Sequence, residues 1–463
     1  MLRLFKQYYP IRNALFVLGE GCIIFLSVIA ACWIILGEKI LQAEISLFMK
    51  ALLITFSCQL CLYYNDLYDL KITSTFSELG IRLLQALGAA AIILAILYFL
   101  FPNVIISEGI FLVSTVIVIL FVVSWRVAYT QVLNKGLFNQ RIIILGSSET
   151  AKEIARQIQE TKDCGYEIAA AISKDAWHDV SCSENFGVIC LNSYENICEL
   201  ATQMKVERIV VALKEKRGDF PIEELLKCRV NGIDIIEGNS FYEMLTGKLI
   251  VEQINPGWLI FAQGFQKSKS QRFVKRTIDL ILSITMLILL MPLLVVIAII
   301  IKLDSKGPII FSQERVGEKH KPYMVHKFRS MRCDAEKDTG PVWAQANDDR
   351  ITRIGHFMRK WRIDEIPQLW NVLKGEMSFV GPRPEREYFV KELTKTIPYY
   401  GERFSVKPGV TGWAQVCYGY GASVRDAIEK LNYDLFYIKN MSILMDIMIY
   451  ARTIKTVLFG KGR

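Results

Sequence analysis

The chain has 463 residues, a formal net charge of +9, an apolar fraction of 52% and a mean hydropathy of +0.29. This hydropathy is high for a wholly soluble protein, and the 22% of charged residues shows that the chain is not apolar throughout. We therefore expect membrane spans joined to polar domains. From residue 304 to the C-terminus, 27 Lys and Arg stand against 19 Asp and Glu, a net charge of +8. In a membrane setting, this excess favours anionic lipid or phosphorylated small molecules over nucleic acid as partners.

The first third of the sequence contains four apolar segments that approach the length needed to cross a bilayer. They are Leu15–Leu36, Ile45–Tyr64, Leu83–Phe101 and Gly109–Trp125. Basic residues precede the first segment, lie between the second and third, and follow the fourth, whereas the loop between the third and fourth has none. The positive-inside rule therefore places both ends of this four-span transmembrane region, residues 1–137, in the cytosol. Glu20 is the one charge in the first segment, and we expect it to be an interfacial carboxylate.

Residues 138–263 alternate short β-rich runs with helical stretches, which is typical of a doubly wound parallel sheet. The expected strands are 141–146, 167–172, 187–191, 208–213 and 232–237, with a helix near Thr150–Glu160. A dinucleotide site would need G-x-G-x-x-G after the first strand. Ser148 and Ala151 occupy the places of the second and third glycines, and Ser148 would obstruct close approach to a pyrophosphate. We expect a Rossmann-like domain that serves packing or regulation.

A basic linker and a further apolar segment, Ile278–Ile301, make up residues 264–303. Pro292 interrupts this segment, removes one backbone hydrogen bond and clashes with the preceding turn, so we expect a kink there. Both flanks are basic, with Lys302 and Lys306 on the far side. An ordinary kinked span would place the most basic domain outside the cell, against the charge rule. A re-entrant helix that returns to the same membrane face satisfies both observations.

The densest polar pattern lies in residues 304–463, the expected catalytic domain. Its segments are Gln313-Glu-Arg315-Val-Gly317, Lys327-Phe-Arg329-Ser-Met331, Arg359-Lys-Trp-Arg362-Ile-Asp364-Glu365-Ile-Pro367, Gly381-Pro-Arg383-Pro384-Glu385 and Lys407-Pro-Gly-Val-Thr-Gly-Trp-Ala-Gln415. Phosphoryl transfer requires that the charge on the reacting phosphates be neutralised. Carboxylates can bind Mg²⁺ for this purpose, and an aspartate can also attack phosphorus. The pattern therefore offers both kinds of group that such a reaction needs.

Asp364 and Glu365 are adjacent, so their side chains diverge unless the backbone turns. Pro367 restricts the residue before it and is consistent with a helix edge or turn at this point. Such a corner would aim one carboxylate at a phosphate and the other at a metal ion. Acid pairs are also common on exposed helices, so the pair by itself is weak support for catalysis.

Arginine and lysine side chains near the acid pair would clamp the phosphates. Arg383 lies between two prolines that stiffen the backbone and preorganise the donor. Lys327 and Arg329 alternate with Phe328, so they can share one strand face. Arg359 and Arg362 are three residues apart, on one side of a short helix that ends near the acid pair. The alternative is a rigid surface turn and basic residues that only contact lipid.

Three segments, Gln313–Met331, Ile363–Glu385 and Lys407–Gln415, together resemble the catalytic domain of the monotopic phosphoglycosyl transferases, the bacterial sugar transferases of polysaccharide synthesis. The match runs from about Phe273 to the C-terminus. The first 270 residues resemble the large members, which place four membrane helices and a Rossmann-like domain before a mostly helical α/β catalytic domain. The arrangement is most similar to exopolysaccharide-type undecaprenyl-phosphate sugar-1-phosphate transferases.

This resemblance implies that a UDP-sugar donates its sugar phosphate to undecaprenyl phosphate at the cytosolic face of the bacterial inner membrane, with release of UMP. Asp364 matches the family's nucleophile, which forms a covalent phosphosugar intermediate, and Glu365 matches its Mg²⁺-associated partner. Arg383 lies in the phosphate-linked Pro-Arg-Pro motif, and Pro292 matches the proline that breaks the re-entrant helix. Polar positions near the nucleotide are matched by Gln313, Arg315, Lys327 and Arg329. The large members also suggest a homodimer.

The sequence departs from the family pattern at Met291, where a small residue often precedes the proline, and at His320 and Tyr323. Two other hypotheses stay open. A membrane-anchored NAD-dependent nucleotide-sugar dehydratase or epimerase would need an intact glycine fingerprint and a Tyr-x-x-x-Lys pair, and Tyr323 and Lys327 have that spacing outside the Rossmann-like segment. A non-enzymatic scaffold of a polysaccharide export complex would not depend on Asp364.

Overall fold

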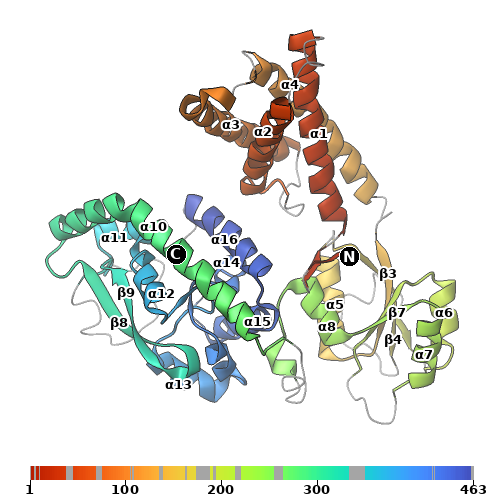
Figure 1. Cartoon of the computed structure of the whole chain (residues 1–463). Helices are drawn as coiled ribbons and strands as arrows, with labels where there is room; N and C mark the ends of the chain where they lie inside the picture. Colours follow the sequence, from red (N-terminus) through yellow and green to blue (C-terminus); the bar gives the residue numbers. More distant parts are fainter. Residues whose placement is uncertain are drawn as a thin grey trace. The chain divides into compact units, whose positions relative to one another are not determined.

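The structure is a computed structural model of the chain (Figure 1) that divides into two compact units, Met1–Phe241 and Tyr242–Arg463. It describes residues 2–4, 7–9, 11–37, 45–68, 76–104, 106, 109–134, 139–161, 164–173, 188–190, 194–213, 220–254, 264–332, 350–419, 421 and 423–459. Each unit is built around its own buried apolar clusters.

Four long apolar helices in the first unit correspond to the four predicted spans. They are α1 (Ile11–Leu36), α2 (Ile45–Tyr64), α3 (Phe76–Leu100) and α4 (Ile110–Asn134). A short antiparallel pair, β1 (Leu2–Leu4) and β2 (Gln7–Tyr9), precedes them. The helices share one apolar core, in which α1 packs against α2 and α4, and α2 packs against α3. By length and composition, α1, α2 and α3 are able to cross a membrane, and α4 has a shorter apolar stretch, Val113–Tyr129. The prediction of four apolar helices near the N-terminus is confirmed, and the chain is a membrane protein.

Glu20, which we expected to be an interfacial carboxylate, does not lie on the surface of the helical bundle. Glu20 is completely buried, and its Oε1 accepts a hydrogen bond from Nε of Arg126 at 2.7 Å. Arg126 also donates to the carbonyl of Leu67 and lies over the ring of Phe16. A buried charge is costly unless it is paired, so this pair joins α1 to α4 inside the bundle.

A five-stranded parallel sheet follows, in the order β5-β4-β3-β6-β7. Its strands are β3 (Gln140–Leu145), β4 (Tyr166–Ser173), β5 (Val188–Cys190), β6 (Arg208–Val211) and β7 (Asp234–Glu237). Its helices are α5 (Glu149–Glu160), α6 (Ile197–Gln203), α7 (Ile222–Val230) and α8 (Gly238–Thr246). Figure 1 shows α5 and α8 on one face of the sheet and α6 and α7 on the other. The predicted parallel sheet is therefore confirmed, with boundaries that shift by one or two residues.

In the turn after β3, Gly146 and Ser148, which occupy the first two glycine positions of a dinucleotide-binding fingerprint, both have structural roles. Gly146 has a φ of +114°, and a Cβ there would lie 2.3 Å from the carbonyl oxygen of Ala212. This glycine is needed for close packing of the turn against the end of β6. The side chain of Ser148 accepts a hydrogen bond from the backbone N–H of Ala151 and caps α5. Both residues thus have structural tasks in the turn.

The second unit is mostly helical with two small sheets. β8 (Ile310–Val316) and β9 (Pro322–Phe328) form an antiparallel pair, and β10 (Ser378–Val380) and β11 (Gly409–Thr411) a parallel pair. The helices are α10 (Lys269–Asp304), α11 (Arg353–Lys360), α12 (Gln368–Lys374), α13 (Glu387–Thr396), α14 (Trp413–Cys417), α15 (Val424–Asn440) and α16 (Ile443–Leu458). The shorter 3-10 turns are η3 (Val251–Gln253), η4 (Glu318–His320), η5 (Ile363–Glu365) and η6 (Tyr400–Ser405).

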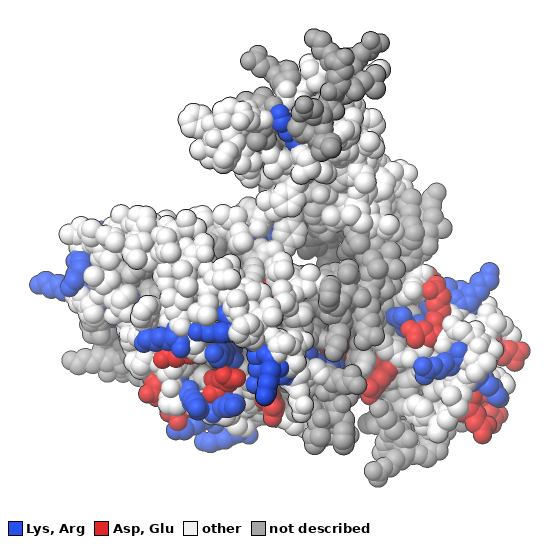
Figure 2. Space-filling view, in the orientation of Figure 1, with Lys and Arg blue, Asp and Glu red and all other residues white. Residues whose placement is uncertain are grey.

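Helix α10 is longer than predicted because it begins before the apolar segment. Ser268 and Gln271 form a capping box at its start, so the basic cluster expected in a linker lies in its first turns. Pro292 lies inside the helix, and Figure 1 shows the helix bending along its length. Many of its apolar side chains are exposed, such as Leu289 at 70% and Leu303 at 82%. Figure 2 shows a largely uncharged face along the middle of this unit's upper edge, whereas basic side chains appear toward the two ends of α10.

Candidate active site

The acid pair lies in the short 3-10 turn η5, between α11 and α12. Arg362 directly before it has a φ of +53°, in the left-handed region, and this turns the chain sharply after α11. Pro367 follows and stands at the start of α12. Asp364 and Glu365 are each only 7% exposed. The pair therefore occupies a buried corner, and its two carboxylates have different surroundings.

Three cationic side chains surround the carboxylate of Glu365. Lys327 Nζ and Arg383 Nη2 both lie close to Oε1, at 2.9 and 2.8 Å, and Arg362 Nη1 lies 3.7 Å from Oε2. Burial raises the pKa of Glu365, but the charges of Arg383, Lys327 and Arg362 outweigh it and hold the pKa well below its ordinary value. Glu365 is therefore a fixed anion that orients the basic residues around it.

The carboxylate of Asp364 has no such partners. Within the described part of the chain, no side chain or backbone N–H donates a hydrogen bond to it. Burial, followed by the negative charge of Glu365, raises its pKa, and Lys327, Arg359 and Arg383 only partly oppose this shift. Two adjacent carboxylates thus have pKa values pushed apart, an arrangement typical of a site that assigns them different roles.

Donors with no partner lie beside this unpaired carboxylate. We expected Arg359 and Arg362 to lie on one side of the same helix. Arg359 is on α11, but Arg362 lies beyond the end of that helix, so this expectation is wrong. Nη1 of Arg359 and Nε of Arg362 are shielded from water and have no hydrogen-bond partner among the described residues. Buried donors without partners are costly in a protein interior. They are therefore suited to an anionic ligand that supplies the missing acceptor atoms.

Gln313 and Arg315 lie in β8 next to the Pro-Arg-Pro loop. Arg315 donates to Oε1 of Gln313 at 2.8 Å and to the carbonyl of Pro384 at 3.3 Å. Its guanidinium also lies 3.7 Å from Glu385. These contacts place Gln313 and Arg315 behind the loop that presents Arg383 to the acid pair.

Arg329 lies elsewhere, although it was expected to join Lys327 on one strand face. Strand β9 ends at Phe328, and the Arg329 side chain is 4% exposed. It donates to the carbonyls of Ser305 and Lys306 at 2.7 and 2.9 Å, at the C-terminal end of α10. A cation at this helix end is favoured by the unpaired carbonyls and the helix dipole. Arg329 thus anchors α10, whereas Lys327 reaches the acid pair.

Two charged residues that contact this site indirectly were missed from the sequence. Arg403 in η6 is 6% exposed and pairs with Asp434 of α15 at 2.8 Å, and it donates to the backbone carbonyl of Arg383. The sequence separates these residues by 20 to 51 positions, and no spacing rule links them. The lone acid in the apolar segment, Asp279, did carry a signal: it is 3% exposed and accepts hydrogen bonds from Ser378 and Phe379 of β10.

A magnesium ion fits the donor set only with help from its substrate. No group of three or more His, Cys, Asp or Glu gathers anywhere in the described ranges. Mg²⁺ commonly uses one or two carboxylates and completes its shell with phosphate oxygens and water. Asp364 is available for this, and Oε2 of Glu365 has only the distant contact with Arg362.

Comparison with known proteins identifies two matching families. Residues 270–460 match the family described as bacterial sugar transferase, and residues 64–236 match a family described as CoA-binding domain. The first match contains α10, the acid pair and the Pro-Arg-Pro loop. The second contains part of the helical bundle and the parallel sheet.

Several curated relatives are similar over longer stretches. A UDP-N-acetylgalactosamine-undecaprenyl-phosphate N-acetylgalactosaminephosphotransferase of Aeromonas hydrophila is 40% identical over 51% of this chain and 55% of its own length. A UDP-galactose-lipid carrier transferase of Erwinia amylovora is 32% identical over 73% of this chain and 72% of its own length. A UDP-glucose:undecaprenyl-phosphate glucose-1-phosphate transferase of Xanthomonas campestris pv. campestris is 31% identical over 71% of this chain and 68% of its own. These matches confirm the resemblance seen in the motifs, and the chain belongs to the bacterial sugar transferase family.

Proposed function

We propose that the protein transfers a sugar-1-phosphate from a UDP-sugar to undecaprenyl phosphate and releases UMP, as the first step in the synthesis of an exopolysaccharide or related glycan. The names of two relatives, those of Aeromonas hydrophila and Xanthomonas campestris pv. campestris, contain both members of this substrate pair. One structural observation carries the proposal: a buried aspartate lies next to a cation-bound glutamate, and neither the aspartate nor two nearby arginine N–H groups has a hydrogen-bond partner among the residues that the structure describes. This combination suits a nucleophile that attacks a phosphate group.

In the first step, a carboxylate oxygen of Asp364 attacks the phosphorus that bears the sugar. A bond forms between this oxygen and phosphorus, and the bond from phosphorus to the oxygen of UMP breaks, so UMP leaves with the electron pair. The raised pKa of Asp364 makes its ionised form a stronger base and a better nucleophile. Arg383, Arg359 and Arg362 would neutralise charge on the phosphates, and Glu365 holds Arg383 and Lys327 in place.

In the second step, a phosphate oxygen of undecaprenyl phosphate attacks the same phosphorus. The new oxygen–phosphorus bond forms as the bond to Asp364 breaks, which yields a diphosphate-linked lipid sugar and regenerates the carboxylate. The lipid and the soluble donor thus use the same aspartate in turn. Mg²⁺ held by Asp364, Glu365 and the donor phosphates would supply further positive charge when bound.

We infer that α10 enters the membrane and returns to the same face. Near its start, Lys275 pairs with Asp446 at 2.7 Å, and Asp279 binds β10. Near its end, Ile301 packs in a cluster with Phe328 of β9, which also includes Met358. One compact polar unit cannot lie on both sides of a bilayer, so contacts from both halves of the helix support a re-entrant course. Together with the basic flanks, this supports a cytosolic active site at the inner membrane.

The parallel sheet of the first unit supports a Rossmann-like domain without dinucleotide chemistry. Ser148 uses its side chain to cap α5, and Gly146 is required for packing against Ala212. We infer a packing or regulatory role for this domain. Self-association as a homodimer stays a prediction from the resemblance.

The test is a transfer assay with purified protein, undecaprenyl phosphate and a panel of UDP-sugars, with UMP release and lipid-linked sugar as readouts. We expect one or a few UDP-sugars to react, and the Asp364→Asn variant to insert and fold but to transfer nothing. NAD binding is measured in parallel, because it would favour the dehydratase or epimerase alternative. Full activity of Asp364→Asn would refute the nucleophile assignment.

A further inference from the structure

The loop that carries Arg383 is held by its backbone carbonyls. Pro382 and Pro384 have no N–H group, so the loop offers few donors of its own. Pro382 accepts from the N–H of Gly409 at 2.9 Å, and Glu385 accepts from the N–H of Val316 at 3.0 Å. The two carbonyls between them accept from arginine side chains instead, that of Arg383 from Arg403 at 3.0 Å and that of Pro384 from Arg315 at 3.3 Å. The loop therefore depends on side-chain donors at its centre.

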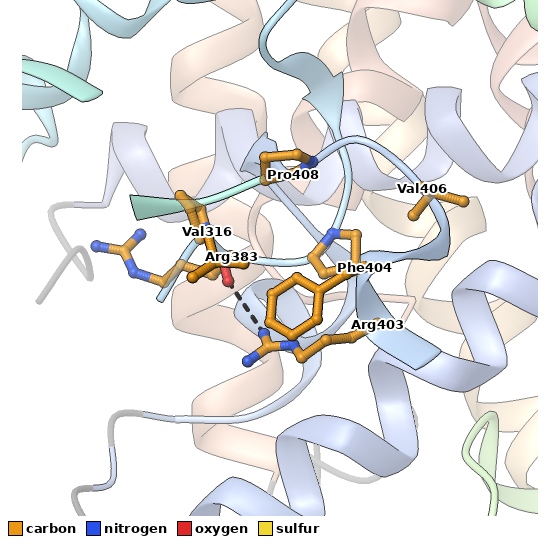
Figure 3. A pocket seen from close by; sticks show the side chains of 8 residues that line it. Val316, Arg383, Arg403, Phe404, Val406 and Pro408 are labelled. Carbon is orange, nitrogen blue, oxygen red and sulfur yellow. Dashed lines mark hydrogen bonds between the residues drawn. The ribbon is translucent and has the colours of Figure 1, made fainter. Parts of the chain in front are cut away.

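Arg403 approaches the loop from the side opposite to the acid pair. Figure 3 shows its guanidinium donating to the Arg383 carbonyl, while the guanidinium of Arg383 points away from it. Arg403 is in turn fixed by Asp434 of α15, which is 2% exposed, and by the hydroxyl of Tyr400. One buried guanidinium thus joins α15 and η6 to the backbone of the loop.

Apolar side chains and Arg403 surround this side of the loop. Val316, Phe404, Val406 and Pro408 line a small cavity there, together with Pro382, Pro384 and the two arginines (Figure 3). Within this lining, the hydrogen bond from Arg403 is the direct polar contact to the Arg383 carbonyl.

The position of the Arg383 side chain depends on its backbone. The side chain is 43% exposed, and among the described residues its close partner in the site is Glu365. A displacement of about 1 Å in a phosphate-binding group can cost about 100-fold in rate. A buried ion pair such as that of Arg403 and Asp434 often adds little net stability to a fold, and the same Arg403 guanidinium also donates to the Arg383 carbonyl.

We propose that Arg403, held by Asp434, is a positioning residue that fixes the carbonyl of Arg383 and thereby aims the Arg383 guanidinium at Glu365 and the donor phosphate. The inference rests on the proposed transfer reaction and names a residue that acts in it without touching the substrate.

The test is a double-mutant cycle between Arg403→Lys and Arg383→Gln in the full-length protein. Lysine keeps the charge opposite Asp434, but its single ammonium cannot reproduce the planar fork that reaches Asp434, Tyr400 and the carbonyl together. We expect Arg403→Lys alone to lower kcat/KM about 10- to 100-fold, through a lower kcat and also through weaker binding of the UDP-sugar. In the Arg383→Gln background, Arg403→Lys should lower kcat/KM less than about threefold, because residue 383 no longer has a guanidinium whose position matters.

Lys248→Met is the matched control, since Lys248 pairs with Glu429 on the same helix α15 at 3.0 Å but does not contact the loop. Melting temperatures are recorded for every variant, and Asp434→Asn replaces Arg403→Lys in the cycle if the latter does not fold. Equal losses in both backgrounds, or no loss in the wild-type background, would overturn the positioning role. Binding of UDP-sugar by calorimetry is measured in the Asp364→Asn background, where the same cycle must also be non-additive. Wild-type protein that binds UDP-sugar but transfers nothing would refute the proposed function while the binding cycle still decides the inference.

Discussion

Neutralising Glu365 is expected to destabilise the protein, whereas neutralising Asp364 is not. Glu365→Gln removes the charge that two cationic side chains contact at 2.8 and 2.9 Å. Removal of one partner from a buried charge pair costs about 3–5 kcal/mol. Water can reach part of Lys327 and Arg383, at 24% and 43% exposure, so a loss below that range, about 2–3 kcal/mol, is expected. For a unit of this size, that corresponds to a melting temperature about 5–10 °C lower.

Asp364→Asn should leave the melting temperature unchanged or raise it by a few degrees. The substitution removes a buried charge that has no hydrogen-bond donor and that lies next to the fixed charge of Glu365. Its burial raises the pKa of Asp364, so the ionised carboxylate costs stability in full above that raised pKa. The cost shrinks as the pH falls below the raised pKa and is gone below the pKa of the unfolded chain. Functional residues often carry such a cost.

The assay is thermal unfolding followed by tryptophan fluorescence in detergent or nanodiscs. Glu429→Gln serves as the control, because its pair with Lys248 is partly exposed, with Glu429 at 29%, and should contribute less than about 1 kcal/mol. Equal destabilisation by Asp364→Asn and Glu365→Gln, or a loss confined to Asp364→Asn, would refute the assignment of different surroundings to the two acids.

Three further outcomes are expected. Because burial and the charge of Glu365 raise the pKa of Asp364, and because only the ionised form attacks, kcat/KM should rise with pH along an acid limb that lies above the ordinary aspartate value of 3.8; a limb at or below that value would contradict the geometry. Arg329→Gln removes a cation from the C-terminal carbonyls of α10 and should cost about 2–4 kcal/mol in stability with little change in KM for the UDP-sugar; an unchanged melting temperature with a raised KM would instead indicate substrate contact. A strong chelator should abolish turnover and Mg²⁺ should restore it, and turnover that is unaffected by the chelator would exclude the metal.

The sequence predicted those parts of the fold that depend on local pattern. Hydrophobic length indicated the four N-terminal helices, and alternating β and α runs indicated the parallel sheet. The start of α10 was missed because the capping box at Ser268 and Gln271 precedes a basic stretch that reads as a linker. The environment of Glu20 was missed because its partner, Arg126, is 106 residues away.

The candidate site was predictable to the extent that its residues lie in recognisable sequence motifs. The motifs predicted that Lys327, Glu365 and Arg383 belong to one site. In the structure, Lys327 and Arg383 both contact Glu365. Sequence alternation suggested the same role for Arg329, but a strand that ends one residue earlier sends it to α10. The supporting role of Arg403 depends on the packing of η6 against α15, which no local pattern encodes.

The covalent step is the central claim, and mass spectrometry tests it most directly. The protein is mixed with its UDP-sugar in the absence of lipid acceptor, quenched and digested. The account predicts one added sugar phosphate on the peptide that contains Asp364, its loss on addition of undecaprenyl phosphate, and no adduct in Asp364→Asn. Rapid transfer to lipid by a protein that never carries this adduct, or an adduct on another residue, would contradict it.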